Sequence, residues 1–135
     1  KFLQNILNDA KDLFRENYKN YYIMHFLINR YLANGNYSQF LRNNFKGDYL
    51  CIELQFNFIS NNFISEINTV LRKYQVVLAG CLDGEYIKNY FTDEQIQYPE
   101  MIYKITSGIN ENEVKLISKN QKTNGFFERF FQLFS

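Results

Sequence analysis

The sequence predicts an α+β fold: a small antiparallel-dominated sheet with helices packed on one face, followed by a C-terminal amphipathic helix. Residues 50–58 alternate between apolar and polar side chains, which is typical of a strand with one solvated face. Residues 2–16 and 63–74 carry apolar side chains at helical spacing, which is typical of helices that pack on a core. The predicted order of elements leaves too few βα units for a parallel, doubly wound sheet.

In the first part of the chain, we expect a helix, a strand and a loop. The apolar face of the helix over residues 2–16 is formed by Phe2, Leu3, Ile6, Leu7, Ala10, Leu13 and Phe14. Residues 21–32 are rich in aromatic and branched side chains, which predicts a strand. The strand should stop at Asn34 and Gly35, a common turn dipeptide, and residues 34–47 are expected to form a polar loop.

The second predicted strand opens another series of elements. Its inward side chains are Leu50, Ile52, Leu54, Phe56 and Phe58, and the residues between them are Cys51, Glu53, Gln55 and Asn57. Residues 60–62 can cap a helix whose apolar positions are Phe63, Ile64, Ile67, Val70, Leu71 and Tyr74. Beyond it, we expect a buried strand over residues 75–81, a short helix or turn over 84–91 and an edge strand over 114–118.

The composition favours one folded domain with a tail. The chain has 135 residues, of which 46% are hydrophobic, and its net charge of +1 is too small to favour nucleic acid as a partner. Cys51 and Cys81 lie in apolar runs without metal-ligand spacing, so we interpret both as core residues. No signal-peptide pattern opens the chain, and the apolar run at residues 76–82 is too short to span a bilayer, so we expect a cytoplasmic protein.

The sequence offers few groups for chemistry. The single histidine, His25, has no second histidine with which to hold a metal, and we interpret it as a structural side chain in mid-strand. Acidic pairs at Asp83 and Glu85 and at residues 93–94 are typical of solvated loops. The glycines form no phosphate-binding loop. We therefore predict a protein that is not an enzyme, with no catalytic residues, metal site or cofactor.

The end of the chain carries the clearest functional pattern. Six apolar side chains occupy an arc of roughly 160° on a helical wheel, and they are Phe126, Phe127, Phe130, Phe131, Leu133 and Phe134. Polar residues fill the rest of the wheel, and Lys122 and Arg129 favour anionic lipid headgroups. We predict that residues 124–135 form a helix that lies on a membrane surface.

Two other readings of this helix remain open. It can pack on the protein's own core, or it can dock in a groove of a partner protein, which would make the chain a small soluble adaptor. A helix of about ten residues is marginal in water. Because part of the binding energy is then spent on folding, stable membrane attachment would need several copies acting together.

One stretch of sequence resembles a known protein family. Residues 23–35, which read IMHFLINRYLANG, are similar without gaps to a segment that commonly reads ILHVIPQDYIVDG in the actin-like bacterial cell-division protein FtsA. Residues 47–50 resemble the Gly-x-x-Leu lead into the next FtsA strand, and residues 62–91 follow that family's order of helix, strand and helix. The terminal pattern at residues 126–134 is also similar to the amphipathic helix that ends FtsA.

The resemblance implies a domain organisation and a set of partners. Residues 1–91 would be the small inserted subdomain of FtsA, residues 92–123 a strand and linker region, and residues 124–135 the membrane-targeting helix. In FtsA the subdomain makes contacts between neighbouring subunits and with later division proteins, so self-association and a place in the divisome at the septum are implied. The family's main partner, FtsZ, binds a part of FtsA that has no counterpart here. The phosphate loops of the actin-like core also have no counterpart, so ATP binding is not implied.

Overall fold

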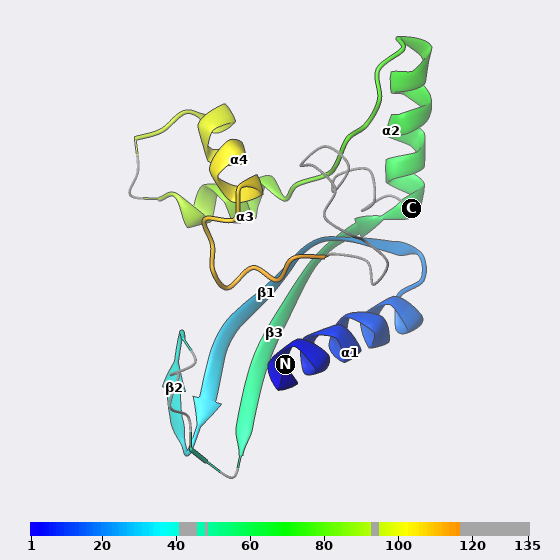
Figure 1. Ribbon diagram of the computed structural model, residues 1–135. Coiled ribbons are helices and arrows are strands. Elements are labelled where there is room, and N and C mark those ends of the chain that lie inside the picture. The colour runs from blue at the N-terminus through cyan, green and yellow to red at the C-terminus, as the bar shows by residue number, and fades with distance from the viewer. Residues whose placement is uncertain (41–45, 48, 93–94, 117–135) are drawn as a thin grey trace. The chain divides into compact units, whose positions relative to one another are not determined.

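A computed structural model gives the structure of the protein, and it describes residues 1–40, 46–47, 49–92 and 95–116. These residues form an α+β fold with one three-stranded antiparallel sheet, as the sequence predicts (Figure 1). The elements are α1 (Phe2–Asn17), β1 (Tyr21–Ala33), β2 (Asn36–Ser38), β3 (Leu50–Ser60), α2 (Asn61–Lys73), α3 (Gly84–Tyr90) and α4 (Tyr98–Thr106).

The sheet has the strand order β2-β1-β3. β1 and β2 form an antiparallel hairpin in which Ala33 lies opposite Asn36. The two turn residues have positive φ angles, 51° at Asn34 and 80° at Gly35, as a tight turn between twisted strands requires. The predicted turn is therefore confirmed, but the loop predicted from residue 34 onward contains the short strand β2, whose three residues are too few to give an alternating pattern.

β3 keeps the predicted alternation over most of its length. Cys51, Glu53 and Gln55 are exposed, whereas the apolar residues between them are half-buried. The prediction that Cys51 is a core residue is therefore wrong, because an odd-numbered position in this strand faces solvent. Phe58, predicted to face inward, is 45% exposed, so the alternation ends before the strand does.

The chain divides into two compact units, which we describe separately. Of the described residues, the first unit contains Lys1–Met24 and Phe58–Cys81, and the second contains His25–Asn57 and Leu82–Leu116. β1 and β3 each contribute residues to both units. The segments that form each unit are far apart in sequence, so each unit depends on long-range contacts.

In the first unit, α1 is held by aromatic rings. The ring of Phe14 lies 4.7 Å from that of Tyr18 and 5.5 Å from that of Phe58, and Tyr21 meets Phe58 edge-on at 5.1 Å. Centroid separations in this range favour aromatic attraction beyond simple burial. Leu7 is buried as the helical pattern predicts, whereas Lys11, which the pattern places on the polar face, is also buried.

α2 begins where the sequence predicts. The Ser60 hydroxyl accepts a hydrogen bond from the backbone N–H of Asn62 at 3.2 Å, which caps the helix. Asn61 joins this helix to the start of β1, because its backbone N–H donates to the carbonyl of Asn20 at 2.9 Å. No residue of α2 is buried, and Phe63 and Val70 on its apolar face are each about half exposed. α2 is therefore an amphipathic helix whose apolar face is only partly buried.

The second unit contains most of the buried side chains. Residues 25–28 of β1 are all buried, which means that both faces of the strand are covered at this point and not one alone. Phe26 is fully buried and stacks on Phe56 with ring centroids 4.4 Å apart. α3 and α4 pack together around Ile87, Phe91 and Ile105. α3 forms where the sequence predicts a short helix or turn over residues 84–91.

Three segments differ from the predictions. Residues 76–83 form no strand, because the chain leaves α2 through a left-handed residue, Gln75 with φ 57°, and Val76 bonds back to Leu71. Val77 in this segment is 68% exposed, so the run is not buried. α4 forms where the sequence predicts strand and linker. In place of an edge strand over residues 114–118, the described part shows a single bridge between Glu113 and Leu27.

Gly35 provides a test of the hairpin. A methyl group at this position would meet no atom within 4 Å, so the only penalty for alanine is the left-handed backbone. We expect Gly35→Ala to lower the free energy of unfolding by about 1 kcal/mol, measured by urea denaturation followed through tyrosine fluorescence. Asn34→Gly is the matched control and should leave stability unchanged or slightly raised. Equal stability of wild type and Gly35→Ala would contradict the turn geometry.

Candidate functional site

The residues predicted to bind membrane lie outside the described part of the chain. This applies to Lys122, Phe126, Phe127, Arg129, Phe130, Phe131, Leu133 and Phe134. Among the described residues, no helix is long and apolar enough to span a bilayer. The most elaborate polar arrangement that the structure describes lies instead around His25.

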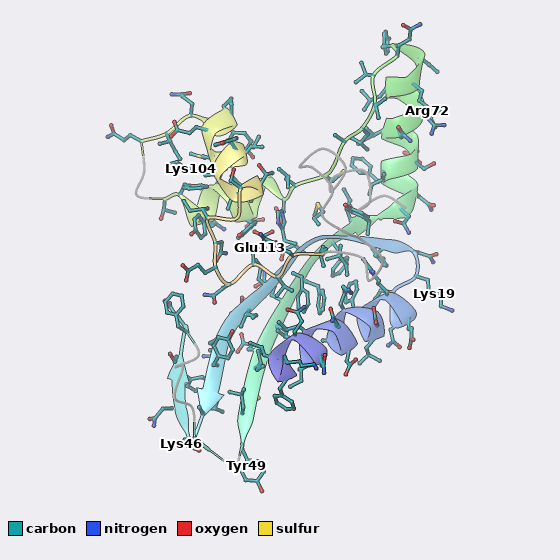
Figure 2. All side chains as sticks on the ribbon, viewed as in Figure 1. Lys19, Lys46, Tyr49, Arg72, Lys104 and Glu113 are labelled. Carbon is teal, nitrogen blue, oxygen red and sulfur yellow. The ribbon has the colours of Figure 1, made fainter. Side chains whose placement is uncertain are left out.

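His25 is almost fully buried in β1, with 1% of its surface exposed. Its Nδ1 lies 2.7 Å from Oε1 of Glu113, and its Nε2 accepts a hydrogen bond of 2.9 Å from the backbone N–H of Asp83. Figure 2 shows the labelled Glu113 between β1 and α3. Both ring nitrogens therefore have partners that come from segments distant in sequence.

These partners fix the protonation of the ring. A backbone N–H can only donate, so Nε2 must offer a lone pair. The proton of the neutral imidazole is then on Nδ1, where it is donated to the Glu113 carboxylate. A single tautomer satisfies both contacts, which is the state that a buried polar side chain requires.

The network continues from the second oxygen of Glu113. The hydroxyl of Tyr86 donates to Oε2 of Glu113 at 2.9 Å and accepts from the side-chain amide of Asn110, also at 2.9 Å. The side-chain oxygen of Asn110 accepts from the backbone N–H of Asn112. Burial raises the pKa of Tyr86, which keeps its hydroxyl protonated as the donor that this arrangement needs.

Asp83 joins the network to α3. One of its carboxylate oxygens accepts from the backbone N–H groups of Glu85 and Tyr86, which caps the helix. The other oxygen accepts from the side-chain amide of Asn57 in β3 at 2.8 Å. Asp83, which the sequence suggests is a solvated loop residue, therefore has a structural role.

Backbone hydrogen bonds place Glu113 next to β1. The N–H of Ile28 donates to the carbonyl of Asn112, and the N–H of Val114 donates to the carbonyl of Phe26, each at 2.8 Å. These bonds flank the bridge between Leu27 and Glu113. The segment is too short to form a strand of its own, but it covers this stretch of β1 and delivers the carboxylate to the imidazole.

A catalytic histidine needs a ring nitrogen that can face a substrate. Here Nε2, the nitrogen that could act as a base, is occupied by the N–H of Asp83. Glu113 orients His25 as a carboxylate orients a catalytic histidine. The lone pair on Nε2, however, is not free to accept a proton from a substrate. No group of three or more potential metal ligands occurs among the described residues.

A second polar cluster lies on the exposed face of the sheet. Nε of Arg30 donates to Glu53 at 2.6 Å, and the guanidinium also lies 4.3 Å from the ring centre of Tyr37. The hydrogen bond from Arg30 lowers the pKa of Glu53. Because both charged groups are about half exposed, this pair adds little to stability.

Sequence reasoning identified His25 as structural but not its partners. Glu113 is separated from His25 by 88 residues, and no pattern in the sequence joins them. Asn110 and Tyr86 were also missed. A buried histidine in mid-strand requires two hydrogen-bond partners, which is the one signal that could have prompted a search for them.

Comparisons of the chain with protein-family models, curated proteins and solved structures find no match. A function can therefore be proposed only from the described geometry and the sequence patterns.

The His25 network can be tested by a double-mutant cycle. We expect His25→Phe to lower the free energy of unfolding by about 3 kcal/mol, because it leaves the Asp83 N–H and Oε1 of Glu113 without their hydrogen bonds to the imidazole. Glu113→Gln should cost less, and the effects of the two changes should not be additive. Additivity within about 0.5 kcal/mol would show that the two side chains are not coupled. Ser65→Ala, on exposed α2, is the control.

Alkaline pH should destabilise the fold. Burial, with a smaller contribution from Cys81, raises the pKa of Tyr22 to about 12, while Arg15 acts in the opposite direction. Between the unfolded value of about 10 and about 12, the unfolded chain releases a proton that the folded chain keeps, so stability falls as pH rises. Urea midpoints measured from pH 9 to 11.5 should fall less steeply in Tyr22→Phe. The exposed Tyr103→Phe serves as control, and an identical slope in Tyr22→Phe would contradict the assignment.

Proposed function

We propose that the protein is a non-catalytic cell-division component resembling FtsA, which self-associates and tethers the division assembly to the cytoplasmic face of the membrane. The observation that carries this proposal is the pattern of residues 126–134, in which five of nine residues are phenylalanine and all the apolar residues fall on one side of a helix. Such a helix is suited to lie at the boundary between headgroups and acyl chains.

The charges near this segment favour an anionic surface. Lys122 and Arg129 are close to or within the helix, and Lys115 and Lys119 precede it. Each basic residue near an anionic membrane contributes about 1 kcal/mol. Because the helix is short and would fold only on contact, the affinity of one copy is low, and an assembly of several copies would bind much more tightly.

The folded part supports the proposal in two ways. The order of α1, β1, β3 and α2 is compatible with the FtsA resemblance, although residues 76–83 do not form the strand that the resemblance implies between α2 and α3. The only histidine has both ring nitrogens occupied, which is consistent with a non-catalytic role. Residues 92–123, which contain α4, would connect this subdomain to the terminal helix at residues 124–135.

The surface of α2 also supports a role in protein contacts. Its apolar face includes Phe63, 50% exposed, and Val70, 52% exposed, and Tyr74 follows at 74%. Exposed apolar side chains clustered on one helix face are typical of interaction surfaces. In the proposed function, later division proteins are the partners of this face. Contact with FtsZ is not included in the proposal, because the given residues show no counterpart of the FtsA region that binds FtsZ.

Sedimentation with vesicles tests the tether. The chain should sediment with vesicles of phosphatidylglycerol and bind less to vesicles of phosphatidylcholine. Phe127→Glu combined with Phe130→Glu should reduce binding at least about tenfold, because two carboxylates would enter the apolar boundary. The control is Gln121→Glu combined with Gln132→Glu, which adds the same charge outside the apolar arc. Equal loss in both double variants would indicate that charge alone governs binding.

The same experiment separates the membrane tether from a soluble adaptor. If the terminal helix docks in a protein groove, the wild type would not sediment with either kind of vesicle, and the phenylalanine variants would instead lose saturable, lipid-independent binding to one protein. That result would contradict the membrane role and favour the adaptor.

A further inference from the structure

The strand β3 lies at an edge of the sheet. In the order β2-β1-β3, its only neighbouring strand is β1, among the residues that the structure describes. An edge strand presents a row of backbone N–H and C=O groups on its outer side. With eleven residues, β3 offers an edge much longer than that of the three-residue β2.

The other side of the central strand is covered. Ala33 and its two predecessors in β1 pair with β2, and Leu27 forms the bridge with Glu113. Backbone bonds from Ile28 and Val114 extend this cover. The chain therefore uses two separate segments to occupy one edge of β1, whereas the outer edge of β3 has no such segment in the described part.

β3 also lacks the two residue types that most often protect an edge from pairing. Natural edges carry lysine, proline or bulges, or are very short. β3 contains neither lysine nor proline. Its single charged residue, Glu53, is already hydrogen-bonded to Arg30. Apart from Glu53 and Phe58, its exposed positions are occupied by the small or neutral polar side chains of Cys51 and Gln55.

The sequence of β3 is compatible with pairing to itself. A two-fold axis through Gln55, the middle residue of the strand, would let all eleven residues pair. Leu54 would lie opposite Phe56 of the second copy, so apolar side chains meet on one face. Glu53 would lie opposite Asn57, whereas an axis through Glu53 would place two carboxylates against each other, which is unfavourable.

We propose that β3 pairs antiparallel with β3 of a second copy of this chain, about a two-fold axis at Gln55, and so joins two sheets into one. This pairing identifies the surface through which the self-association in the proposed function would occur. It rests on the proposed function only for the expectation that the chain self-associates. The partner is a second copy because the open edge, the alternation and the position of the one charge all satisfy the symmetry of a homodimer.

A charge exchange at Gln55 tests the pairing. The wild type should dimerise in analytical ultracentrifugation, and Gln55→Lys should weaken the dimer at least about tenfold, because two like charges meet on the axis. Gln4→Lys, at an exposed position of α1, adds the same charge and should leave the dimer intact. Mixing Gln55→Lys with Gln55→Glu should restore pairing as a heterodimer.

Cross-linking tests the register. Directly opposite residues in antiparallel strands have Cα atoms about 4.5 or 5.5 Å apart, which suits a disulfide. In a chain with Cys51→Ser and Cys81→Ser, the change Gln55→Cys should give a disulfide-linked dimer under mild oxidation. Glu66→Cys, exposed on α2, should not. Circular dichroism confirms that each variant is folded.

Several outcomes would overturn the proposal. These are a wild type that stays monomeric at high concentration, a dimer that Gln55→Lys does not weaken, and equal cross-linking at Gln55→Cys and Glu66→Cys. The membrane role fails separately: a chain that dimerises through Gln55 but does not bind vesicles would contradict the tether and leave the pairing intact. A chain that binds vesicles as a monomer would contradict the pairing and leave the tether intact.

Discussion

The structure of the second unit depends on the full hydrogen bonding of one buried imidazole. His25 lies inside the central strand, where an unpaired nitrogen would carry a large desolvation cost. One nitrogen receives the N–H of Asp83, and the other donates to Glu113. These two contacts hold the start of α3 and the segment around Glu113 against β1. Because the ring has a single satisfying tautomer, it also specifies how the three segments meet.

This constraint affects what the protein can do. An imidazole whose two nitrogens are both occupied is a structural group, and Tyr86 and Glu113 are occupied in the same network. These three side chains are thus used to hold the fold. The proposed function depends on surfaces, among them the exposed apolar face of α2 and the edge of β3.

The proposed surfaces are individually weak and act best together. The proposed amphipathic helix is short and would give modest membrane affinity, and pairing through one strand edge would give a dimer with two such helices. Linking the two events raises the effective concentration of the second helix at the membrane once the first has bound. Self-association and membrane attachment would then reinforce each other without any new contact.

Features that depend on neighbouring residues could be predicted from the sequence. Four features depend only on residues a few positions apart, because each reflects local backbone geometry or a regular spacing. They are the amphipathic pattern of α1, the Ser60 cap of α2, the turn at Asn34 and Gly35 and the alternation of β3. The terminal pattern at residues 126–134 is also a regular spacing, but it lies outside the described residues and stays a prediction.

Other features were decided by tertiary structure. The valine-rich run after α2 has high strand propensity but forms no strand in the described part of the chain, and Cys51 is exposed although its neighbours are apolar. The pairing of His25 with Glu113 joins residues 88 positions apart. Such contacts depend on which segments meet in space, and a local pattern cannot specify this because it fixes the direction of a side chain within its own element and not what lies opposite.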